Sequence, residues 1–394
     1  MKARLAIAGG GIGGLAAAFA GRRAGCEVAL FEQAEFFSEV GAGIQMGPNV
    51  TAILREWGLL EGELAASVAR PGRLRARGAD DGRELAALAL GAGFESRYGA
   101  PYLTVHRADL QTALLQAARE AGATLRNGAR VTQAAQDEHG VHVAAGGNFD
   151  ADALIGADGL WSSTRQLVVP ADTPPRATGH LAYRAVVRQT ELPAASRSTE
   201  VTAWLGAGLH VVSYPVRAGD WLNVVCVVEG CIERDPRSWD HAAIAADLYA
   251  STRAVCTPLR DLLGAVANWR FWVLHDRPVL RGPGEMAAGR VALLGDAAHP
   301  MLPYLAQGAG MAVEDARELQ RVLQSEGDVA RDLPAALQRY ALHRWARCAR
   351  VQARSLRNGR IFHLEGPMRA ARDLSMRVMG SRLLDVPWLY GQKR

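Results

Sequence analysis

Lysine is almost absent from this chain, since only Lys2 and Lys393 stand among its 45 basic residues. Arginine supplies the rest, and no arginine-rich run is interleaved with aromatic side chains. A basic stretch with stacking aromatics is the usual footprint of a nucleic-acid site. The net charge of +5 therefore indicates genomic base composition and not a nucleic-acid partner.

Cysteine is also scarce, with five residues in 394 and no CxxC spacing. An odd, scattered set argues against a disulfide framework and against a zinc site. We expect free thiols, no metal, and a reducing, cytoplasmic location.

Long apolar runs are missing too. The one candidate, residues 5–21, resembles the core of a signal peptide, but five of the six residues from Gly9 to Gly14 are glycine. Because glycine is a poor helix former, we expect neither a cleaved leader here nor a membrane span anywhere.

The length of 394 residues exceeds what one compact core usually holds, which favours two domains or one domain with a large insertion. A hydrophobic share of 49% and a charged share of 22% are ordinary for a globular protein.

The first forty residues combine a strand, a glycine turn, a helix and a second strand. We expect strands at residues 5–8 and 27–31 and a helix at 15–23, with Gly9-x-Gly11-x-x-Gly14 at the first turn and Glu32 after the second strand. This spacing is typical of dinucleotide binding.

Each residue of this motif has a physical role. Gly9 permits the tight turn, Gly11 lets the backbone approach a pyrophosphate, and Gly14 lets the helix pack on the strand. The helix N-terminus then directs its N–H groups at the phosphates, and Glu32 can accept hydrogen bonds from the adenosine ribose. The motif alone leaves NAD and FAD both open.

Three further signatures follow along the chain. Residues 155–165 read as a strand that ends in Asp158-Gly159 and then a helix start. Residues 289–316 read as a strand, Gly295-Asp296, a proline-containing turn and a helix that opens on Gly308-Ala309-Gly310. Arg107 begins a helical run in the sequence VHRADL.

The four signatures together, in this order and spacing, resemble the single-component FAD-dependent aromatic hydroxylases, in particular those of the salicylate hydroxylase and 3-hydroxybenzoate 6-hydroxylase type. The resemblance implies an α/β fold like that of p-hydroxybenzoate hydroxylase: a Rossmann-like FAD-binding domain, an inserted antiparallel β-sheet substrate domain and a helical C-terminus. The boundaries we expect are 1–175 with 276–360 for the FAD domain, 176–275 with part of 73–105 for the substrate domain, and 361–394 for the C-terminal segment.

The resemblance also implies the contacts of a non-covalent FAD. Asp296 would bind the ribityl chain, and the helix that begins at Gly308 would direct its positive end at the flavin ring, where small residues let the backbone come close. The glycine-rich loop at residues 41–49 would lie beside that ring. The full set is Gly9, Gly11, Gly14, Glu32, Gln33, Gln45, Arg107, Val131, Asp158, Asp296, Gly308, Ala309 and Gly310.

Residues 176–275 have a different sequence pattern, in which β-branched runs and alternating polar and apolar residues predict an antiparallel sheet. In the strand GLHVVSYPV, His210 and Tyr214 share one face by period two. This pair resembles the substrate pair of the salicylate, 3-hydroxybenzoate and 6-hydroxynicotinate enzymes, where His210 would be the base that deprotonates a phenol. Plain core packing is the alternative for both residues.

Three further residues are candidates for contacts with the substrate. Pro303 and Tyr304 lie where the family turns its chain over the substrate. Arg184 could bind the carboxylate of the substrate or a phosphate of the nicotinamide cofactor, or it could form an ion pair with a carboxylate of a neighbouring strand. We interpret His299 as structural. Histidines near Gln45 and Tyr304, which 6-hydroxynicotinate enzymes prefer, are missing, so salicylate comes first and 3-hydroxybenzoate second.

The resemblance implies a monooxygenase that uses NADH or NADPH and O2, and that hydroxylates a small phenolic acid through a flavin C4a-hydroperoxide. A flavin oxidase or reductase that does not hydroxylate is the alternative from another class. A homodimer is a candidate assembly. In the helical last third, the periodic arginines from Arg344 to Arg354 predict a solvated face.

Overall fold

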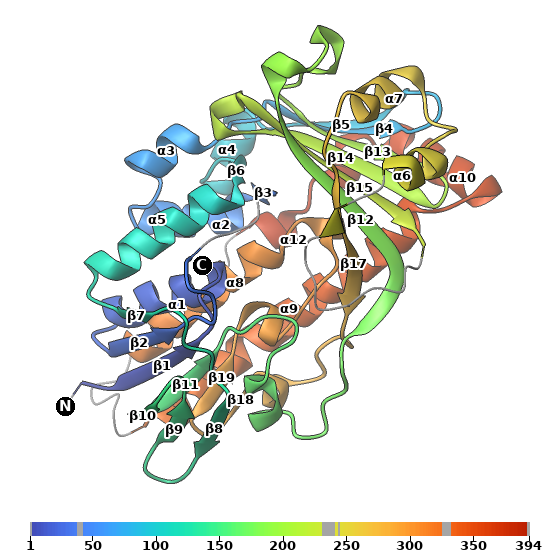
Figure 1. Cartoon of the computed structure of the whole chain (residues 1–394). Helices are drawn as coiled ribbons and strands as arrows, with labels where there is room; N and C mark the ends of the chain where they lie inside the picture. The colour runs from blue at the N-terminus through green and yellow to red at the C-terminus, as the bar shows by residue number, and fades with distance from the viewer. Residues whose placement is uncertain (1, 38–41, 231–240, 243–244, 325–331, 392–394) are drawn as a thin grey trace. The chain divides into compact units, whose positions relative to one another are not determined.

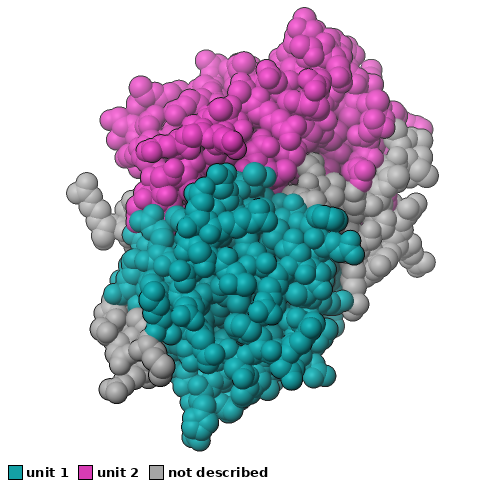
Figure 2. Space-filling model, turned by 60° about the vertical axis from the view of Figure 1, so that its left-hand side comes forward, with its two compact units in different colours: residues 1–39, 110–176, 276–356 teal, residues 40–109, 177–275, 357–394 magenta. Residues whose placement is uncertain are grey.

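The computed structural model describes residues 2–37, 42–230, 241–242, 245–324 and 332–391. The chain divides into two compact units, which are coloured in Figure 2. Unit 1 comprises residues 1–39, 110–176 and 276–356, and unit 2 comprises residues 40–109, 177–275 and 357–394. Residues 40–109, which the sequence assigns largely to the first domain, thus group with the second.

Unit 1 is built on a six-stranded sheet in the order β18-β19-β11-β1-β2-β7, flanked by a small sheet in the order β10-β9-β8 (Figure 1). Its strands are β1 (Arg4–Ala8), β2 (Glu27–Phe31), β7 (Thr124–Arg126), β8 (Gln133–Gln136), β9 (Val141–Ala144), β10 (Asn148–Ala151), β11 (Ala153–Gly156), β18 (Ala287–Ala288) and β19 (Val291–Leu293). Its helices are α1 (Ile12–Arg23), α8 (Gly308–Gln324) and most of α5 (Arg107–Glu120) and α9 (Leu333–Phe362).

Strands β7, β2, β1, β11 and β19 all pair in parallel, and only β18 runs antiparallel to its neighbour. β1 and β11 are buried almost throughout, as expected of parallel strands with helices on both faces. Helix α1 lies against α8, and this close approach depends on small side chains: a Cβ on Gly13 would come within 3.2 Å of the Ala312 Cβ.

Unit 2 is built on an eight-stranded sheet in the order β16-β17-β12-β15-β14-β13-β4-β5, with a two-stranded sheet of β3 and β6. Its strands are β3 (Gly43–Met46), β4 (Arg73–Gly78), β5 (Glu84–Ala89), β6 (Leu103–His106), β12 (Arg176–Arg188), β13 (Val201–Leu205), β14 (Leu209–Val216), β15 (Trp221–Glu229), β16 (His241–Ala242) and β17 (Arg270–Asp276). Its helices are α2 (Pro48–Glu56), α3 (Glu63–Ser67), α4 (Ala92–Tyr98), α6 (Ala245–Ser251), α7 (Thr257–Gly264), α10 (Gly366–Met379), α11 (Ser381–Leu384) and α12 (Pro387–Tyr390).

The large sheet of unit 2 has one apolar face. Alternate residues of β12, β14 and β15, such as Tyr183, Val211 and Val224, form a core cluster with Leu248 of α6 and Leu259 of α7. By the two-residue period of a strand, the intervening residues point to the opposite face. That second face carries the polar residues described below.

No helix among the described residues is both long enough and apolar enough to cross a bilayer.

The glycine turn after β1 gives a test of the fold. A Cβ on Gly14 would lie 1.9 Å from the Gly9 carbonyl oxygen, whereas a Cβ on Gly11 would meet no atom within 4 Å. We predict that Gly14→Ala lowers the free energy of unfolding by about 3 kcal/mol, the upper part of the range for overpacking. Gly11→Ala, at a helix N-cap with φ of −71°, should cost less than about 1 kcal/mol.

Denaturant unfolding of the two purified apoproteins measures this difference. Equal stability of both variants would show that the strand and helix do not need the close approach at Gly14.

Candidate active site

Three of the four signatures follow neighbouring strands of unit 1. The glycine motif follows β1, Asp158 follows β11, and Asp296 follows β19, and these strands are adjacent in the sheet. Because they are parallel, their carboxyl ends lie at the same edge. In open α/β sheets this edge is where ligands bind.

The glycine turn has the geometry that a close ligand requires. Gly9 has a φ of 100°, in the region that favours glycine, and a Cβ there would overlap the Ala157 backbone. Gly11 is the N-cap of α1 with no side-chain cap, and the position of its Cβ opens onto free space. The first N–H groups of α1 therefore have room for a phosphate group.

Glu32 stands at the end of β2 and is held by the backbone. Its Oε2 accepts a hydrogen bond from the Gly10 N–H at 2.6 Å, and its Oε1 accepts one from the Ala34 N–H at 2.8 Å. A carboxylate has about four lone-pair positions, so these bonds orient Glu32 and leave acceptor capacity for a ribose hydroxyl.

Asp158 caps the short 3₁₀ helix at Thr164–Leu167. It accepts hydrogen bonds from the Ser162 hydroxyl at 2.6 Å and from the Ser163 and Thr164 N–H groups at 2.9 and 3.1 Å. The next residue, Arg165, is buried and donates to the Ala297 and Ala298 carbonyl oxygens at 3.1 and 2.7 Å. Arg165 thereby connects the Asp158 turn to the Asp296 turn.

A buried carboxylate fixes the Gly295-Asp296 turn through hydrogen bonds. Asp315 of α8 accepts hydrogen bonds from the Gly295 N–H at 3.0 Å and from His299 Nε2 at 2.6 Å. Its other oxygen accepts from Arg344 Nε at 2.7 Å. His299 and Asp315 have no exposed surface.

The electrostatics of this network favour the ion pair. Burial opposes charge on His299, but the adjoining Cys348 and Asp315 raise its pKa well above the usual value. Burial likewise opposes charge on Asp315, yet His299 and Arg344 lower its pKa. We interpret His299, as the sequence suggested, as a structural partner of Asp315.

Asp296 lies in the short 3₁₀ turn Gly295–Ala297, beside the first residue of α8. A Cβ on Gly308 would come within 4.0 Å of the Asp296 Oδ1, so this carboxylate and the N-terminus of α8 are neighbours. The preceding loop is fixed by α9, where Gln352 donates to the Pro300 carbonyl at 3.1 Å and Ser355 to the Leu302 carbonyl at 2.6 Å. Ala306 has a φ of 52°, an uncommon conformation for a residue with a side chain.

In unit 2, His210 and Tyr214 lie on the polar face of the large sheet. They are 3% and 4% exposed, and the register pairs them with Val227 and Asn223 of β15. Burial, together with His363 and His180, lowers the pKa of His210 well below the usual value, so its ring is neutral at neutral pH.

Tyr214 belongs to a compact polar group. It is hydrogen-bonded to Gln45, which also accepts from the Tyr102 hydroxyl at 2.7 Å. Asn223 accepts the Gly43 N–H at 2.7 Å, and a Cβ on Gly43 would lie 2.4 Å from the Tyr214 ring. A glycine is thus required at position 43; Gly41 of the same loop lies outside the described residues.

The remaining candidate residues have varied environments. Arg184 is 6% exposed, and its guanidinium lies 4.4 Å from the centre of the Trp272 ring, which is a cation–π contact. Arg107 begins α5, with its N–H bonded to the Ala42 carbonyl at 2.8 Å. Pro303 and Gln33 are exposed, whereas Tyr304 and Val131 are buried.

One expectation from the sequence is wrong. Arg344 does not belong to a solvated face, because it is 6% exposed and pairs with Glu314 and Asp315 at 2.8 and 2.7 Å. Arg347 pairs with Glu314 at 2.6 Å. The period of the arginines in α9 is correct for a helix, but Arg344 and Arg347 face the acidic residues of α8, whereas Arg350 is exposed as expected.

Two groups in the described part of the chain bring three possible metal ligands within 4.8 Å of one another: His299 with Asp315 and Cys348, and His180 with Glu229 and His363. In the first group the ligand atoms are already committed to the ion pair described above. We interpret both groups as hydrogen-bonding clusters.

The buried ion pair gives a second test. Asp315→Asn would leave Arg344 and His299 without their carboxylate, so we predict a loss of about 3–5 kcal/mol in the free energy of unfolding. Since the folded pKa of Asp315 is depressed, the loss should be complete above the ordinary aspartate pKa of about 3.9 and fade as the pH falls below it. Denaturant titrations at several pH values measure it, with Asp261→Asn, at an exposed position of α7, as a control that changes little.

Comparisons with known proteins agree with this geometry. Residues 2–355 match the family described as FAD binding domain. The chain is 38% identical to a 3-amino-4-hydroxybenzoate 2-monooxygenase of Streptomyces platensis, over 99% of this chain and 96% of the relative. It is 37% identical to a 3-hydroxybenzoate 6-hydroxylase of Polaromonas naphthalenivorans, over 98% and 95%.

A solved salicylate hydroxylase substrate complex superposes with a TM-score of 0.84 and 26% identity, over 100% of this chain and 96% of that one. These matches confirm the α/β fold and the FAD cofactor inferred from the sequence. The chain therefore belongs to the FAD-binding family of flavoprotein hydroxylases, and it is an FAD-dependent aromatic monooxygenase.

Proposed function

We propose that this enzyme uses NAD(P)H and O2 to hydroxylate a small aromatic acid with a phenolic hydroxyl, and that His210 takes the phenol proton. The observation that carries this proposal is the pair of buried polar side chains, His210 and Tyr214, on the polar face of the unit 2 sheet. Buried polar groups are costly unless they are hydrogen-bonded, and both have partners, His363 for His210 and Gln45 for Tyr214. The second nitrogen of a neutral His210 ring can still offer a lone pair to a phenol.

Bound FAD, once reduced by NAD(P)H, activates O2 and supplies an electrophilic oxygen atom. An electrophile reacts with an electron-rich ring, and the ring of a phenolate has a much higher electron density than that of a phenol. His210 would therefore act as general base on the hydroxyl. Tyr214, whose pKa is raised by burial, stays protonated and would donate a hydrogen bond that orients the substrate.

Residues that follow the strands of unit 1 fit the different parts of FAD. The N–H groups after Gly11 would bind the pyrophosphate, Glu32 the adenosine ribose, and Asp296 a ribityl hydroxyl. The N-terminus of α8 would stabilise negative charge on the reduced ring. Gln33, Gln45, Arg107, Val131, Asp158, Ala309 and Gly310 complete the proposed contacts.

For the substrate we propose a hydroxybenzoate, with 3-hydroxybenzoate tested first and salicylate second. The relatives named above support this order, because the more similar ones act on hydroxybenzoates other than salicylate. Arg184, Pro303 and Tyr304 are the proposed contacts beside His210 and Tyr214. We also propose cytoplasmic location, where NAD(P)H is supplied; the homodimer stays a prediction.

Coupling between NADH oxidation and hydroxylation tests the proposed function. We predict that 3-hydroxybenzoate or salicylate stimulates NADH oxidation with little peroxide, and that His210→Ala retains FAD but loses hydroxylation by about 10²- to 10⁴-fold, the usual contribution of a general base. Tyr214→Phe should lose less. Product chromatography and a peroxide assay on the same samples separate the two fates of the electrons.

Two results would count against this function. Unchanged product formation by His210→Ala removes that residue as the base. Recovery of all electrons as peroxide with every acid, 6-hydroxynicotinate included, favours the alternative of a flavin oxidase.

Flavin affinity tests the Asp296 assignment. A hydrogen bond to a charged group contributes about 1.5–3 kcal/mol, so we predict that Asp296→Ala binds FAD about 10- to 100-fold more weakly. Titration of apoprotein with FAD, followed by flavin fluorescence, measures the dissociation constant. The exposed Asp150→Asn is the control, and equal affinities of the two variants would contradict the assignment.

A further inference from the structure

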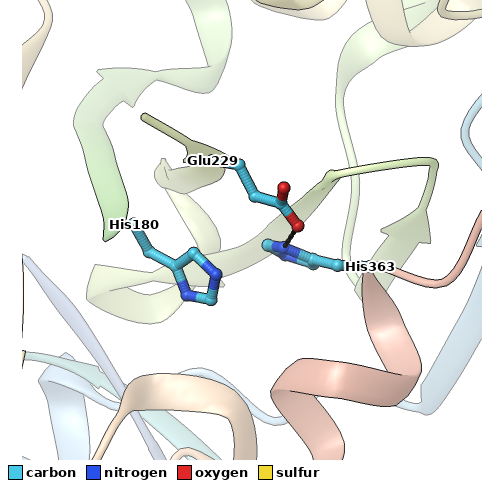
Figure 3. Close-up of side chains that lie close together, drawn as sticks. All are labelled: His180, Glu229 and His363. Carbon is cyan, nitrogen blue, oxygen red and sulfur yellow. Dashed lines mark ion pairs between the residues drawn. The ribbon is translucent and has the colours of Figure 1, made fainter. Parts of the chain in front are cut away.

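A chain of three side chains runs from His210 to the surface of unit 2. His210 Nδ1 lies 2.9 Å from His363 Nε2, and His363 Nδ1 lies 3.5 Å from Glu229 Oε1. His210 and His363 are 3% and 6% exposed, whereas the Glu229 side chain is 56% exposed. Figure 3 shows Glu229 of β15 directed at His363, which follows α9. The chain therefore connects a buried imidazole with solvent.

We propose that Glu229 and His363 fix the tautomer of His210 and carry the phenol proton from it to solvent. The inference rests on the proposed role of His210 as base and names the two residues through which that base works. His363 and Glu229 are positioning residues, since both act through His210.

The tautomer follows from the donor and acceptor capacities along the chain. Glu229 Oε1 lies 3.5 Å from His363 Nδ1, and its negative charge favours the proton of neutral His363 on that nitrogen, because a carboxylate attracts an N–H group and repels a lone pair. His363 Nε2 is then an acceptor and takes the N–H of His210 Nδ1. The lone pair of His210 is thereby left on Nε2, the nitrogen that does not face His363. A carboxylate that orients a catalytic histidine through its second nitrogen is the same physical device.

The proton transfer balances along the same path. When the phenol O–H bond breaks, its proton binds His210 Nε2, and the Nδ1 proton of His210 passes to His363 Nε2. The Nδ1 proton of His363 then passes to Glu229 or to water beside it. No atom is oxidised or reduced, and one proton leaves the buried site for each phenolate formed.

The charges around His363 favour passing the proton on. His180 of β12, Glu229 of β15, His210 of β14 and Arg372 of α10 are the titratable or charged groups that act on this pair. Burial, followed by His180 and Arg372, lowers the pKa of His363 to about 4. Neither imidazole is therefore stably protonated at neutral pH, and the exposed Glu229 is the acceptor nearest to solvent.

The cluster contains a matched control residue. The ring centroid of His180 lies 5.0 Å from that of His363, and Figure 3 shows His180 beside His363 and Glu229. Substitution of His180 removes a ring that contacts His363 and one of the groups that lower its pKa. It leaves the contacts from His210 through His363 to Glu229 in place.

The experiment compares His363→Phe, Glu229→Gln and His180→Phe as FAD-loaded enzymes, with EDTA present to remove stray metal ions. We expect His363→Phe to lower kcat for hydroxylation about 10- to 100-fold at pH 7, with unchanged flavin content and substrate affinity, because only the orienting partner of the base is lost. Glu229→Gln should lose less, since water can also accept the proton. His180→Phe should lose clearly less than His363→Phe, because it removes a group that lowers the pKa of His363 but no member of the relay.

Two readouts distinguish the relay from a structural role. The loss in His363→Phe should shrink as the pH rises towards the phenol pKa, where the substrate ionises without a base. Imidazole added to His363→Ala should restore part of the rate, and it should not accelerate His180→Ala. These variants also serve if His363→Phe fails to fold.

Equal rates for His363→Phe and His180→Phe, or a loss that neither pH nor imidazole relieves, would overturn the relay while His210 remains the base. Normal hydroxylation by His210→Ala is a different result, and it would overturn the proposed function and the relay together.

Discussion

The turn between β19 and α8 depends on one buried carboxylate. Asp315 binds the Gly295 N–H, His299 and Arg344 with its two oxygens, and it stands in the helix whose first residue neighbours Asp296. A charge without exposed surface is stable only when it is fully paired. The same pairing fixes the strand end, the turn and the helix start as one rigid piece, on which the flavin contacts proposed for Asp296 and α8 depend.

Arg165 extends this piece to the neighbouring strand. Its guanidinium binds the carbonyl oxygens of residues 297 and 298, while Asp158 caps the 3₁₀ helix in which Arg165 lies. The signatures after β11 and β19 are thus connected by the Arg165 side chain. A preformed site of this kind spends little binding energy on ordering its own loops.

The two faces of the unit 2 sheet have different roles: one forms the apolar core, and the other carries the proposed substrate contacts. One face packs Val211, Val224 and their neighbours against α6 and α7. The other carries His210, Tyr214, Asn223 and Glu229, whose contacts with Gln45 and His363 come from distant parts of the chain. The sheet holds these side chains on one face, which suits a site that must orient an aromatic ring.

Local signals in the sequence predicted much of this. The strand–glycine turn–helix at the N-terminus, the helix start at Gly308 and the shared face of His210 and Tyr214 all follow from spacing over a few residues. What the sequence could not reveal are contacts across long separations. Nothing near His210 indicates His363, 153 residues away, and nothing in the arginine period of α9 indicates that Arg344 is buried against Asp315.

Asn223 offered one weak signal, since asparagine is uncommon in a β-branched strand. Its partner Gly43 appears only once the strands are placed. The grouping of residues 40–109 with the second unit has the same origin, because contact density and not sequence order decides it.

Incorporation of oxygen-18 from labelled O2 tests the central claim most directly. The purified enzyme is supplied with FAD, NADH and 3-hydroxybenzoate or salicylate, and the product is analysed by mass spectrometry. A monooxygenase should place one labelled atom in the new hydroxyl of the ring. Label found only in peroxide or water, with the aromatic acid recovered unchanged, would contradict the account.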